Sequence, residues 1–421
     1  MALPHARNLI GAVAIIALMI AAGLLVAQDQ ETLRVRSPMA ATDPRFPAYL
    51  SRLLGHSLTT GDSYRVHANE AAFPAMLAAI ERARHRVSFE TYIYKDAGEI
   101  PEQFTSAFEA AAKRGVDVRL VFDGLGATLS PEHVRRLERA GCRIGWFNRL
   151  GTFSLEEVNY RTHRKALVID GDVAFVGGIG IDDQWARDVD GQRRWRDAMV
   201  EVRGPAAINV EAAFNENWIE TVGLVEPDLV TRDDEPDGSA QSIVVWSSSE
   251  GGTNALKLLY LLAIASAQTS IDIQSPYLIT DESTRWSLAE ARRRGVRIRM
   301  LVEGDITDAK PVKFAGREDY ELFLSQGIQV YEYQPAMMHA KAVIIDGLLS
   351  VVGSANFDNR SLELNDELNI AVFDRTLAAR LTADFEADLT ESQKLDLDEW
   401  RARPLHIKAR ETLWSFFGEV F

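Results

Sequence analysis

Two short segments of the chain share one pattern, in which His, one residue, Lys, four residues and Asp follow one another. The residues that fit it are His163, Lys165 and Asp170 in the first segment, and His339, Lys341 and Asp346 in the second. A neutral imidazole can attack phosphorus, and a second imidazole, when protonated, can donate a proton to the leaving alkoxide. Two lysines can neutralise the non-bridging oxygens while charge develops on them. The paired pattern therefore predicts phosphodiester chemistry that uses no metal and no other cofactor.

One copy of this spacing would carry little weight, because a single His is more often a core or surface residue than a catalytic one. The chain has eight His in all, and two of them occupy matching places in the two copies. The residues between each Lys and Asp, 166–169 and 342–345, are apolar and rich in β-branched types, which predicts a buried strand. Side chains two apart on a strand share a face, so we expect the His and Lys of each copy to point into one site.

The segments around the two motifs also repeat, in the same order, at an offset of about 180 residues. The matching pairs are expected strands at 86–94 and 269–279, a helix end with a Gly and a strand near 115 and 295, and a Gly turn with a strand at 139–149 and 325–335. Expected helices, such as 73–84 and 103–114, alternate with these strands. This alternation predicts an α/β fold in two similar halves, each with a parallel or mixed sheet.

At these residues the sequence resembles the phospholipase D superfamily, whose signature is HxKxxxxD followed by GSxN. The resemblance covers about residues 60–400 and implies two pseudo-symmetric αβα sandwich domains with the active site between them. It implies that one His forms a covalent phospho-enzyme and that the other acts first as acid and then as base. The N-terminal His, here His163, is usually the covalent one, although the second half is the better furnished with polar residues. Asp170 and Asp346 are then mainly structural.

The resemblance also implies an acidic residue downstream of each motif that orients a His. Glu367 fits that place in the second half, and Asp197 looks like its partner in the first. Ser354 and Asn356, from GSxN, are expected to donate hydrogen bonds to the phosphate oxygens. The first half has Gly178 and Gly180 at the matching places, where backbone N–H groups would have to replace these side chains. The surrounding Gly, Gln and Trp residues resemble cardiolipin synthase-like members, and they are Gly177–Ile181, Gln184, Trp185 and Trp195–Asp197.

The N-terminal residues predict a membrane anchor. Residues 10–26 are uncharged and mostly apolar, and as a helix they would reach roughly 26 Å, just enough to cross the hydrocarbon of a bilayer. The small residues 21–23 fit a cleaved signal peptide instead, but the apolar run continues past them and favours an anchor. Arg7 indicates a cytoplasmic N-terminus, whereas Arg34 and Arg36 indicate the reverse. We therefore predict a single-pass membrane protein without a defined orientation.

The repeat and its flanks divide the chain into five predicted parts. They are the anchor, 1–30; the first phospholipase D-like domain, 60–225, with its motif at 157–184; an acidic linker, 226–239; the second domain, 240–400, with its motif at 333–360; and an amphipathic tail, 401–421. The tail places several aromatic residues close together, and such a helix either contacts the membrane interface or packs on the domain. Nothing in the sequence indicates an oligomeric state.

Three functions remain open at this point. The first is transfer of phosphatidyl between two phosphatidylglycerols, as in cardiolipin synthase, with release of glycerol. The second is hydrolysis of phospholipid or nucleic acid, and the third is a non-catalytic membrane scaffold. The formal charge of −15 counts against nucleic acid, whose binding needs a basic surface. The anchor favours a phospholipid substrate, and the two complete motifs count against a scaffold. The acceptor, whether a lipid or water, is decided by pocket shape alone.

Overall fold

The computed structural model describes residues 32–37, 39–149, 160–226, 238–248 and 254–415. The predicted anchor at 1–30 and nearly all of the predicted acidic linker at 226–239 lie outside these residues. Within the described part of the chain, no helix is both long and apolar enough to cross a membrane.

The first half contains seven strands that follow the expected order. Its elements are β1 (Leu58–Ala68), α3 (Ala72–Arg82), β2 (Arg86–Thr91), α4 (Glu99–Lys113), β3 (Asp117–Asp123), α5 (Pro131–Ala140), β4 (Arg143–Phe147), β5 (Lys165–Ile169), β6 (Val173–Gly177), β7 (Ala198–Arg203) and α7 (Ala206–Val222), preceded by α2 (Phe46–Leu54). The expected helices and strands of this half are present, with ends that differ by a few residues.

The second half repeats this order with added short elements. They are β8 (Ala240–Trp246), α8 (Ala255–Ser266), β9 (Ser270–Gln274), β10 (Leu278–Ile279), α9 (Glu282–Arg293), β11 (Arg297–Glu303), α10 (Lys310–Gly316), α11 (Tyr320–Ser325), β12 (Gln329–Tyr333), β13 (Ala342–Ile345), β14 (Leu349–Gly353), β15 (Phe357–Asp358), α12 (Asn359–Glu363), β16 (Leu368–Phe373), α13 (Arg375–Thr390), β17 (Ser392–Lys394), α14 (Leu397–Arg401) and α15 (Leu405–Ser415). The motif strands of the two halves are thus β5 and β13.

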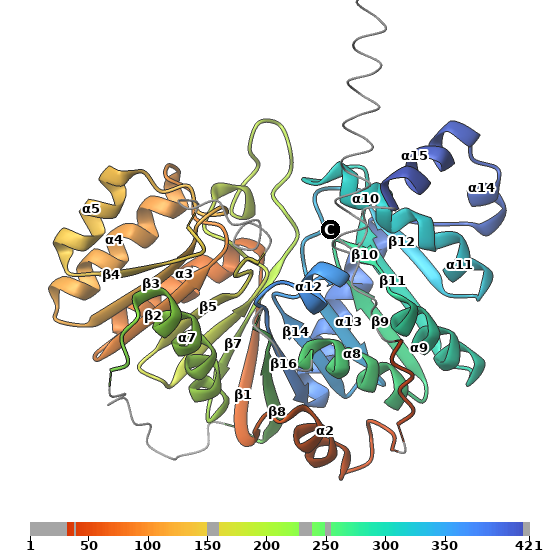
Figure 1. Cartoon of the computed structure of the whole chain (residues 1–421), viewed down its shortest axis with the longest axis horizontal. Coiled ribbons are helices and arrows are strands. Elements are labelled where there is room, and N and C mark those ends of the chain that lie inside the picture. The colour runs from red at the N-terminus through yellow and green to blue at the C-terminus, as the bar shows by residue number, and fades with distance from the viewer. Residues whose placement is uncertain (1–31, 38, 150–159, 227–237, 249–253, 416–421) are drawn as a thin grey trace, which may run out of the picture.

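The halves are joined edge to edge into one 15-stranded mixed sheet, in the order β17-β12-β11-β9-β13-β14-β16-β8-β1-β7-β6-β5-β2-β3-β4. The antiparallel pairing of β1 with β8 forms the junction, which lies at the centre of Figure 1. Outward from it the two halves run strand for strand, because β7, β6, β5, β2, β3 and β4 match β16, β14, β13, β9, β11 and β12. The repeat in the sequence is therefore a structural repeat, and the predicted pair of sandwiches shares a continuous sheet.

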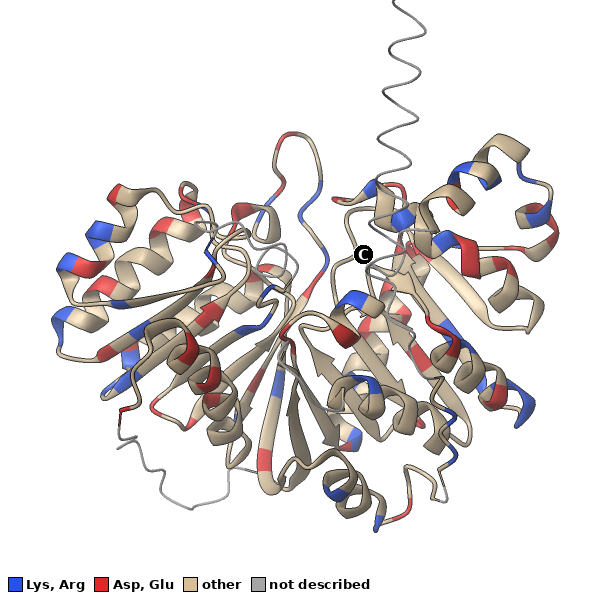
Figure 2. Cartoon of the chain, viewed as in Figure 1, with Lys and Arg blue, Asp and Glu red and all other residues tan. Residues whose placement is uncertain are grey.

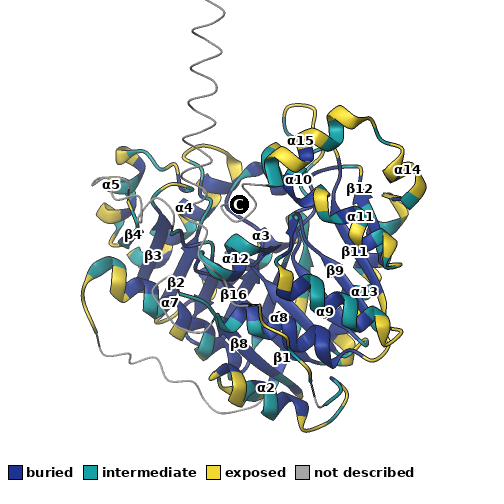
Figure 3. Ribbon diagram, turned by 45° about the vertical axis from the view of Figure 1, so that its right-hand side comes forward, coloured by how far each residue is buried: buried dark blue, intermediate teal, exposed yellow. Residues whose placement is uncertain are grey.

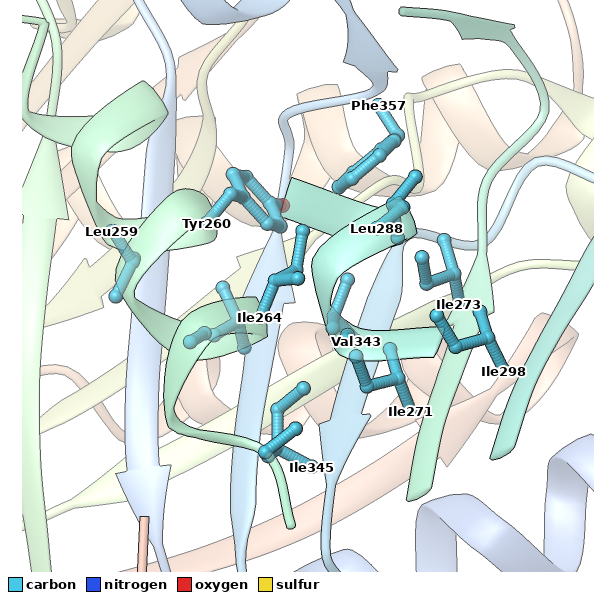
Figure 4. Close-up of a cluster of buried hydrophobic side chains, with 14 of the residues drawn as sticks. Leu259, Tyr260, Ile264, Ile271, Ile273, Leu288, Ile298, Val343, Ile345 and Phe357 are labelled. Carbon is cyan, nitrogen blue, oxygen red and sulfur yellow. The ribbon is translucent and has the colours of Figure 1, made fainter. Parts of the chain in front are cut away.

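Helices cover the sheet on both faces, and the strands are almost entirely buried (Figure 3). In the second half, α8 and α9 lie over β9, β11 and β13, where Ile264 and Leu288 pack with Ile273, Ile298 and Val343 (Figure 4). The helix α8 is apolar on nearly all sides and almost wholly buried, because α2 packs on the side that the sheet leaves open.

A separate hydrophobic cluster contains side chains from both halves. Its members include Val168 of β5, Val202 of β7 and Val210 of α7 from the first half, with Ile344 of β13, Ile370 of β16 and Leu377 of α13 from the second. Since each fully buried side chain of this kind contributes roughly 1.5–3 kcal/mol, the cluster fixes the two motif strands relative to each other.

The described part of the predicted tail forms α15, which packs against α10 of the second half. The buried Glu411 accepts ion pairs from Arg317 at 3.0 Å and Arg403 at 2.8 Å. Leu413 is about half exposed, and residues 416–421 lie outside the described chain. Packing on the domain, one of the two alternatives for this helix, is therefore what the described residues show.

The aspartate of each motif closes the turn at the far end of its strand from the His. Asp170 has a φ of 54° and Asp346 a φ of 52°, in the left-handed region that Asp tolerates better than most residues. The Asp170 carboxylate accepts the backbone N–H groups of Arg84, His85 and Arg86. Asp346 does the same for residues 268–270. Both carboxylates tie the motif turn to the start of the neighbouring strand.

We predict that Asp170→Ala lowers the free energy of unfolding by about 2–4 kcal/mol, because three N–H groups lose a charged acceptor and Ala is strained at this φ. Asp170→Asn keeps one acceptor oxygen and tolerates the conformation, so it should lose less. Urea unfolding followed by circular dichroism in detergent measures both. Unchanged stability of Asp170→Ala with lost activity would show that this aspartate takes part in the chemistry instead.

Candidate active site

Both motif histidines line one pocket of about 450 Å³, which opens between the halves. The side chains around it lie at or near the ends of β2, β3 and β5 in the first half and of β9, β11, β13 and β15 in the second, and in α10 and α12. They are Tyr92, Ile93, Leu125, Arg161, His163, Tyr277, Asp308, Val312, His339, Asn356, Asp358, Arg360, Ser361 and Asn365. The sequence expectation that the two motifs meet at a single site agrees with this placement.

Each histidine is bonded to a carboxylate from the opposite half. His163 Nδ1 lies 2.8 Å from Glu367 Oε1, and His339 Nδ1 lies 2.7 Å from Asp197 Oδ2. The backbone makes the same exchange, since His163 N donates to Asp366 O and His339 N donates to Arg196 O. The sequence located these carboxylates but assigned each to the motif of its own half, and the structure corrects this pairing. Neither histidine can be oriented without the other half.

The carboxylates determine which imidazole nitrogen faces the pocket. Burial alone would raise the pKa of Asp197, but His339 and Lys341 together hold it below its ordinary value. The pKa of Glu367 is likewise lowered, against burial, by His163 and Lys165. An ionised carboxylate only accepts hydrogen bonds, so Nδ1 of each histidine carries the proton. Each Nε2 is then available, with a lone pair for attack or with a proton to donate.

The two lysines lie buried behind the histidines. Lys165 Nζ donates to the carbonyl of His163 at 2.9 Å, and Lys341 Nζ donates to the carbonyl of His339. Burial lowers the pKa of Lys165 to about 7 and that of Lys341 to about 8, and the charge of Lys341 lowers the pKa of Lys165 further. Burial also lowers the pKa of His163 to about 4 and lowers that of His339. This cluster of buried cationic groups is arranged to receive an anion.

The residues expected to bind phosphate divide into two kinds. Asn356 lines the pocket, but only its Nδ2 group can donate to phosphate oxygens, so its expected contact stays a prediction. Two of the other three expectations are corrected by the structure. Ser354 donates its hydroxyl to Glu367 Oε2, and the Gly178 N–H donates to the carbonyl of Ala198. A Cβ on Gly180 would lie 2.9 Å from Cβ of Ile93 and 3.1 Å from the Trp185 ring, so this glycine makes room for both side chains, and the expected phosphate contact of its N–H stays a prediction.

The two carboxylates are supported by different residues. In the second half, the Ser354 hydroxyl supports Glu367; in the first half, a Cβ at Gly178 would come within 2.4 Å of the Asp197 carboxylate. The donor there is Trp185, whose Nε1 lies 3.0 Å from Asp197 Oδ2, the oxygen that His339 also contacts. The Trp185 ring packs edge-on against His339, with centroids 5.6 Å apart. The indole N–H thus takes the place of the missing serine hydroxyl.

Sequence reasoning missed several pocket residues, namely Tyr92, Arg161, Tyr277, Asp308 and Arg360. Sequence position could have identified two of them, because Tyr92 follows β2 and Tyr277 follows β9, the strand of the second half that corresponds to β2. Tyr92 packs edge-on against His163, with centroids 5.3 Å apart. Arg161 has its guanidinium bonded to Asp123 at 2.9 Å, and so it anchors the residues before the motif.

The sequence profile described as "Cardiolipin synthase, PLD-like domain" matches the chain twice, at residues 76–218 and 260–389. The chain belongs to this family. Among its relatives, the cardiolipin synthase of Geobacillus kaustophilus is 30% identical over 399 residues, which cover 93% of this chain and 79% of the relative. Cardiolipin synthase 2 of Bacillus cereus is 32% identical over 369 residues, covering 86% and 70%. The activity of this cardiolipin synthase-like chain is therefore that of a phosphatidyltransferase of the cardiolipin synthase type.

Solved structures show the same fold at low sequence identity. Phosphatidylserine synthase of Haemophilus influenzae superposes with a TM-score of 0.67 at 12% identity, covering 89% of this chain and all of that protein. Polyphosphate kinase of Porphyromonas gingivalis has a TM-score of 0.56 at 14% identity, covering 88% of this chain and 53% of the kinase chain. The two-half arrangement is thus common to this fold.

The lowered lysine pKa values predict a loss of activity at alkaline pH, in addition to the loss caused by deprotonation of His339, whose pKa burial lowers. Above about pH 7 to 8 the free enzyme loses the lysine protons, and with them the charge that stabilises the phosphate oxygens, so kcat/KM should fall as pH rises. A bound anionic phosphate raises these pKa values, so the corresponding limb of kcat should lie at higher pH. Steady-state pH profiles measure both limbs. A limb of kcat/KM near pH 10, the ordinary lysine value, would contradict the prediction.

The contact of Trp185 with Asp197 predicts that Trp185→Phe lowers kcat about tenfold, the scale of one hydrogen bond to a charged group. KM should stay near the wild-type value, because Trp185 is fully buried and lies outside the pocket wall. Trp195→Phe is the matched control, since the Trp195 ring also packs on His339 but has no hydrogen bond to Asp197. Equal losses in both variants would assign the effect to packing and not to the indole N–H.

Proposed function

We propose that the chain transfers the phosphatidyl group of one phosphatidylglycerol to a hydroxyl of a second, releasing glycerol, through a phosphohistidine on His163. The exchanged pairs of His163 with Glu367 and His339 with Asp197 carry this proposal, because they present two Nε2 atoms to one pocket. One imidazole can then attack phosphorus while the other transfers protons.

In the first step, the lone pair of His163 Nε2 attacks phosphorus, and the bond from phosphorus to the glycerol oxygen breaks. His339 donates its Nε2 proton to the departing oxygen and becomes neutral. Burial keeps the pKa of His339 low in the free protein, but the bound anionic phosphate favours the protonated form. Lys165 and Lys341 neutralise the equatorial oxygens, and Asn356 contacts the same group from the pocket wall.

In the second step, neutral His339 removes the proton from the acceptor hydroxyl, and the acceptor oxygen attacks phosphorus. The bond to His163 Nε2 breaks, so both histidines return to their initial states. Trp185 and Ser354 act by holding the two carboxylates, and Asp170 and Asp346 act by holding the motif turns. These roles use protein groups alone, so we propose that no metal or cofactor takes part.

A phospholipid fits the pocket better than nucleic acid does. The apolar Ile93 and Leu125 line it, and Leu125 is 48% exposed. Lys and Arg are interspersed with Asp and Glu along the helices and strands of both halves in the view of Figure 2. The predicted anchor would keep this pocket at a bilayer and so at its substrate. Hydrolysis of the same intermediate, with water as acceptor, is the second candidate function.

The decisive experiment gives phosphatidylglycerol to the purified full-length protein in detergent with excess chelator. We expect cardiolipin and glycerol in equal amounts, and a loss of at least about a thousandfold for His163→Ala or His339→Ala. Mass spectrometry of the products measures both. Phosphatidic acid without cardiolipin would show a hydrolase, and activity that depends on an added divalent ion would refute the metal-free step.

The role of each histidine is tested by quenching the reaction in acid and locating the phosphorylated residue by peptide mass spectrometry. The phosphatidyl group should be found on the peptide that contains His163. Modification of the His339 peptide alone would reverse the two roles and leave the two-step transfer intact.

A further inference from the structure

The two halves contribute chemically different walls to the shared pocket. In the sheet register, Val87 pairs with Ile169 and Ile271 pairs with Ile345. Ile169 and Ile345 directly precede the motif aspartates of their halves, so Val87 and Ile271 occupy matching positions. Ile93 and Tyr277 follow these two residues at the same distance along the chain and are therefore counterparts. The match extends to hydrogen bonds, since Thr91 Oγ1 donates to the carbonyl of Ile93 and Ser275 Oγ donates to that of Tyr277.

The next loops differ in the same way. Leu125 follows β3, and Asp308 follows β11, the strand at the matching place; both residues line the pocket. The first half therefore presents an apolar pair, Ile93 and Leu125, where the second half presents a hydrogen-bonding pair, Tyr277 and Asp308. At these two matched places the pocket is apolar on one side and polar on the other, although Tyr92 and Arg161 of the first half and Val312 of the second also line it. This difference fits a ligand that has an apolar and a hydroxylated part.

The polar wall is held in place. The phenol of Tyr277 donates to Asp308 Oδ1, and Ser275, which receives the N–H of Phe357 at 2.9 Å, fixes the Tyr277 backbone next to Asn356. Asp308 has no other hydrogen bond among the described residues. Asp308 also lies close enough to His339 and Lys341 for its negative charge to favour their protonated forms. Tyr277 and Asp308 belong to the same half as His339 and line the same pocket.

A carboxylate at this place opposes binding of an anionic phosphate, because like charges repel. It favours ligand groups that donate hydrogen bonds. Asp308 retains a carboxylate oxygen for one hydroxyl, and the Tyr277 oxygen, whose proton goes to Asp308, can accept from a second. Two acceptors side by side match neighbouring hydroxyls of a polyol such as glycerol.

We propose that Tyr277 and Asp308 form the acceptor subsite, which binds the hydroxyl groups of a polyol headgroup and directs the phosphatidyl group to it in preference to water. This inference rests on the proposed function, in which the leaving glycerol and the incoming hydroxyl both face His339. The apolar wall of Ile93 and Leu125 then faces the diacylglycerol part.

The test separates the acceptor step from the first step. The full-length protein in detergent receives a phosphatidyl ester of p-nitrophenol together with glycerol at a fixed concentration. Release of p-nitrophenolate reports formation of the intermediate, and the ratio of phosphatidylglycerol to phosphatidic acid reports its partition between glycerol and water. Any effect of a substitution on the first step cancels in this ratio.

We expect Asp308→Asn and Tyr277→Phe each to lower the ratio about tenfold, the scale of one lost hydrogen bond to a charged group. Asp305→Asn is the matched control. It removes the same charge from the same loop, but Asp305 pairs with Lys313 at 3.1 Å and lies outside the pocket wall; its ratio should stay within about twofold of wild type. Tyr277→Phe changes no charge, so its effect cannot come from the field at His339.

Unchanged ratios in Asp308→Asn and Tyr277→Phe would overturn the acceptor subsite, as would an equal fall in Asp305→Asn. A preference of the wild type for ethanolamine over glycerol as acceptor would also overturn it. That result would mean that the carboxylate binds an ammonium group and that the pair does not select hydroxyl groups. If the wild type releases p-nitrophenolate but yields phosphatidic acid alone, the proposed transferase function fails, and this outcome is distinct from the others.

Discussion

The exchange of carboxylates between the halves is the interaction on which the rest of the site depends. Glu367 and Asp197 each hold a histidine that belongs to the other half, and backbone hydrogen bonds at Asp366 and Arg196 repeat the exchange. These two buried hydrogen bonds can form together only if the position of one half relative to the other is fixed. The continuous sheet through β1 and β8 and the shared apolar cluster supply this rigidity. The fold therefore aligns the two imidazoles, and each of them is oriented by a carboxylate of the other half.

Burial of so many charges is costly unless each is paired. In the site, hydrogen bonds and charge pairing among lysine, carboxylate and imidazole offset this free-energy cost. Further charged side chains are buried next to the site. Arg164, which alternates with His163 and Lys165 along the strand, points to the opposite face and donates to the carbonyls of Ala213 and Ser247. The second half has Ala340 at the place that corresponds to Arg164. Near His339 the buried arginine is instead Arg196, which pairs with Asp388 of the second half at 2.8 Å.

Much of this could be predicted from the sequence, because the relevant signals are local. The motif strands, the glycine turns and the half-to-half repeat follow from period, residue type and spacing, and the resemblance to the phospholipase D superfamily implied the structural role of the motif aspartates. Three features could not be predicted because they depend on how distant segments meet. The carboxylate pairing crosses the halves, Ser354 is occupied by Glu367, and the amide of Gly178 is used within the sheet. The role of Trp185 was hidden for the same reason, since its partners Asp197 and His339 come from elsewhere in the chain.

The departures from symmetry separate the functions of the two halves. A duplicated site with identical walls would treat both sides of the phosphorus alike, whereas in-line displacement needs a nucleophile on one side and an exchangeable group on the other. Here His163 lies beside the aromatic face of Tyr92, with the apolar Ile93 and Leu125 in the same half. His339 faces Tyr277 and Asp308, which accept hydrogen bonds from hydroxyls. Leaving glycerol and incoming acceptor both require a hydroxyl-binding side, so the asymmetry of the walls is consistent with the proposed attack by His163. The two halves thus repeat the imidazole and its carboxylate but differ in the loops that surround the pocket.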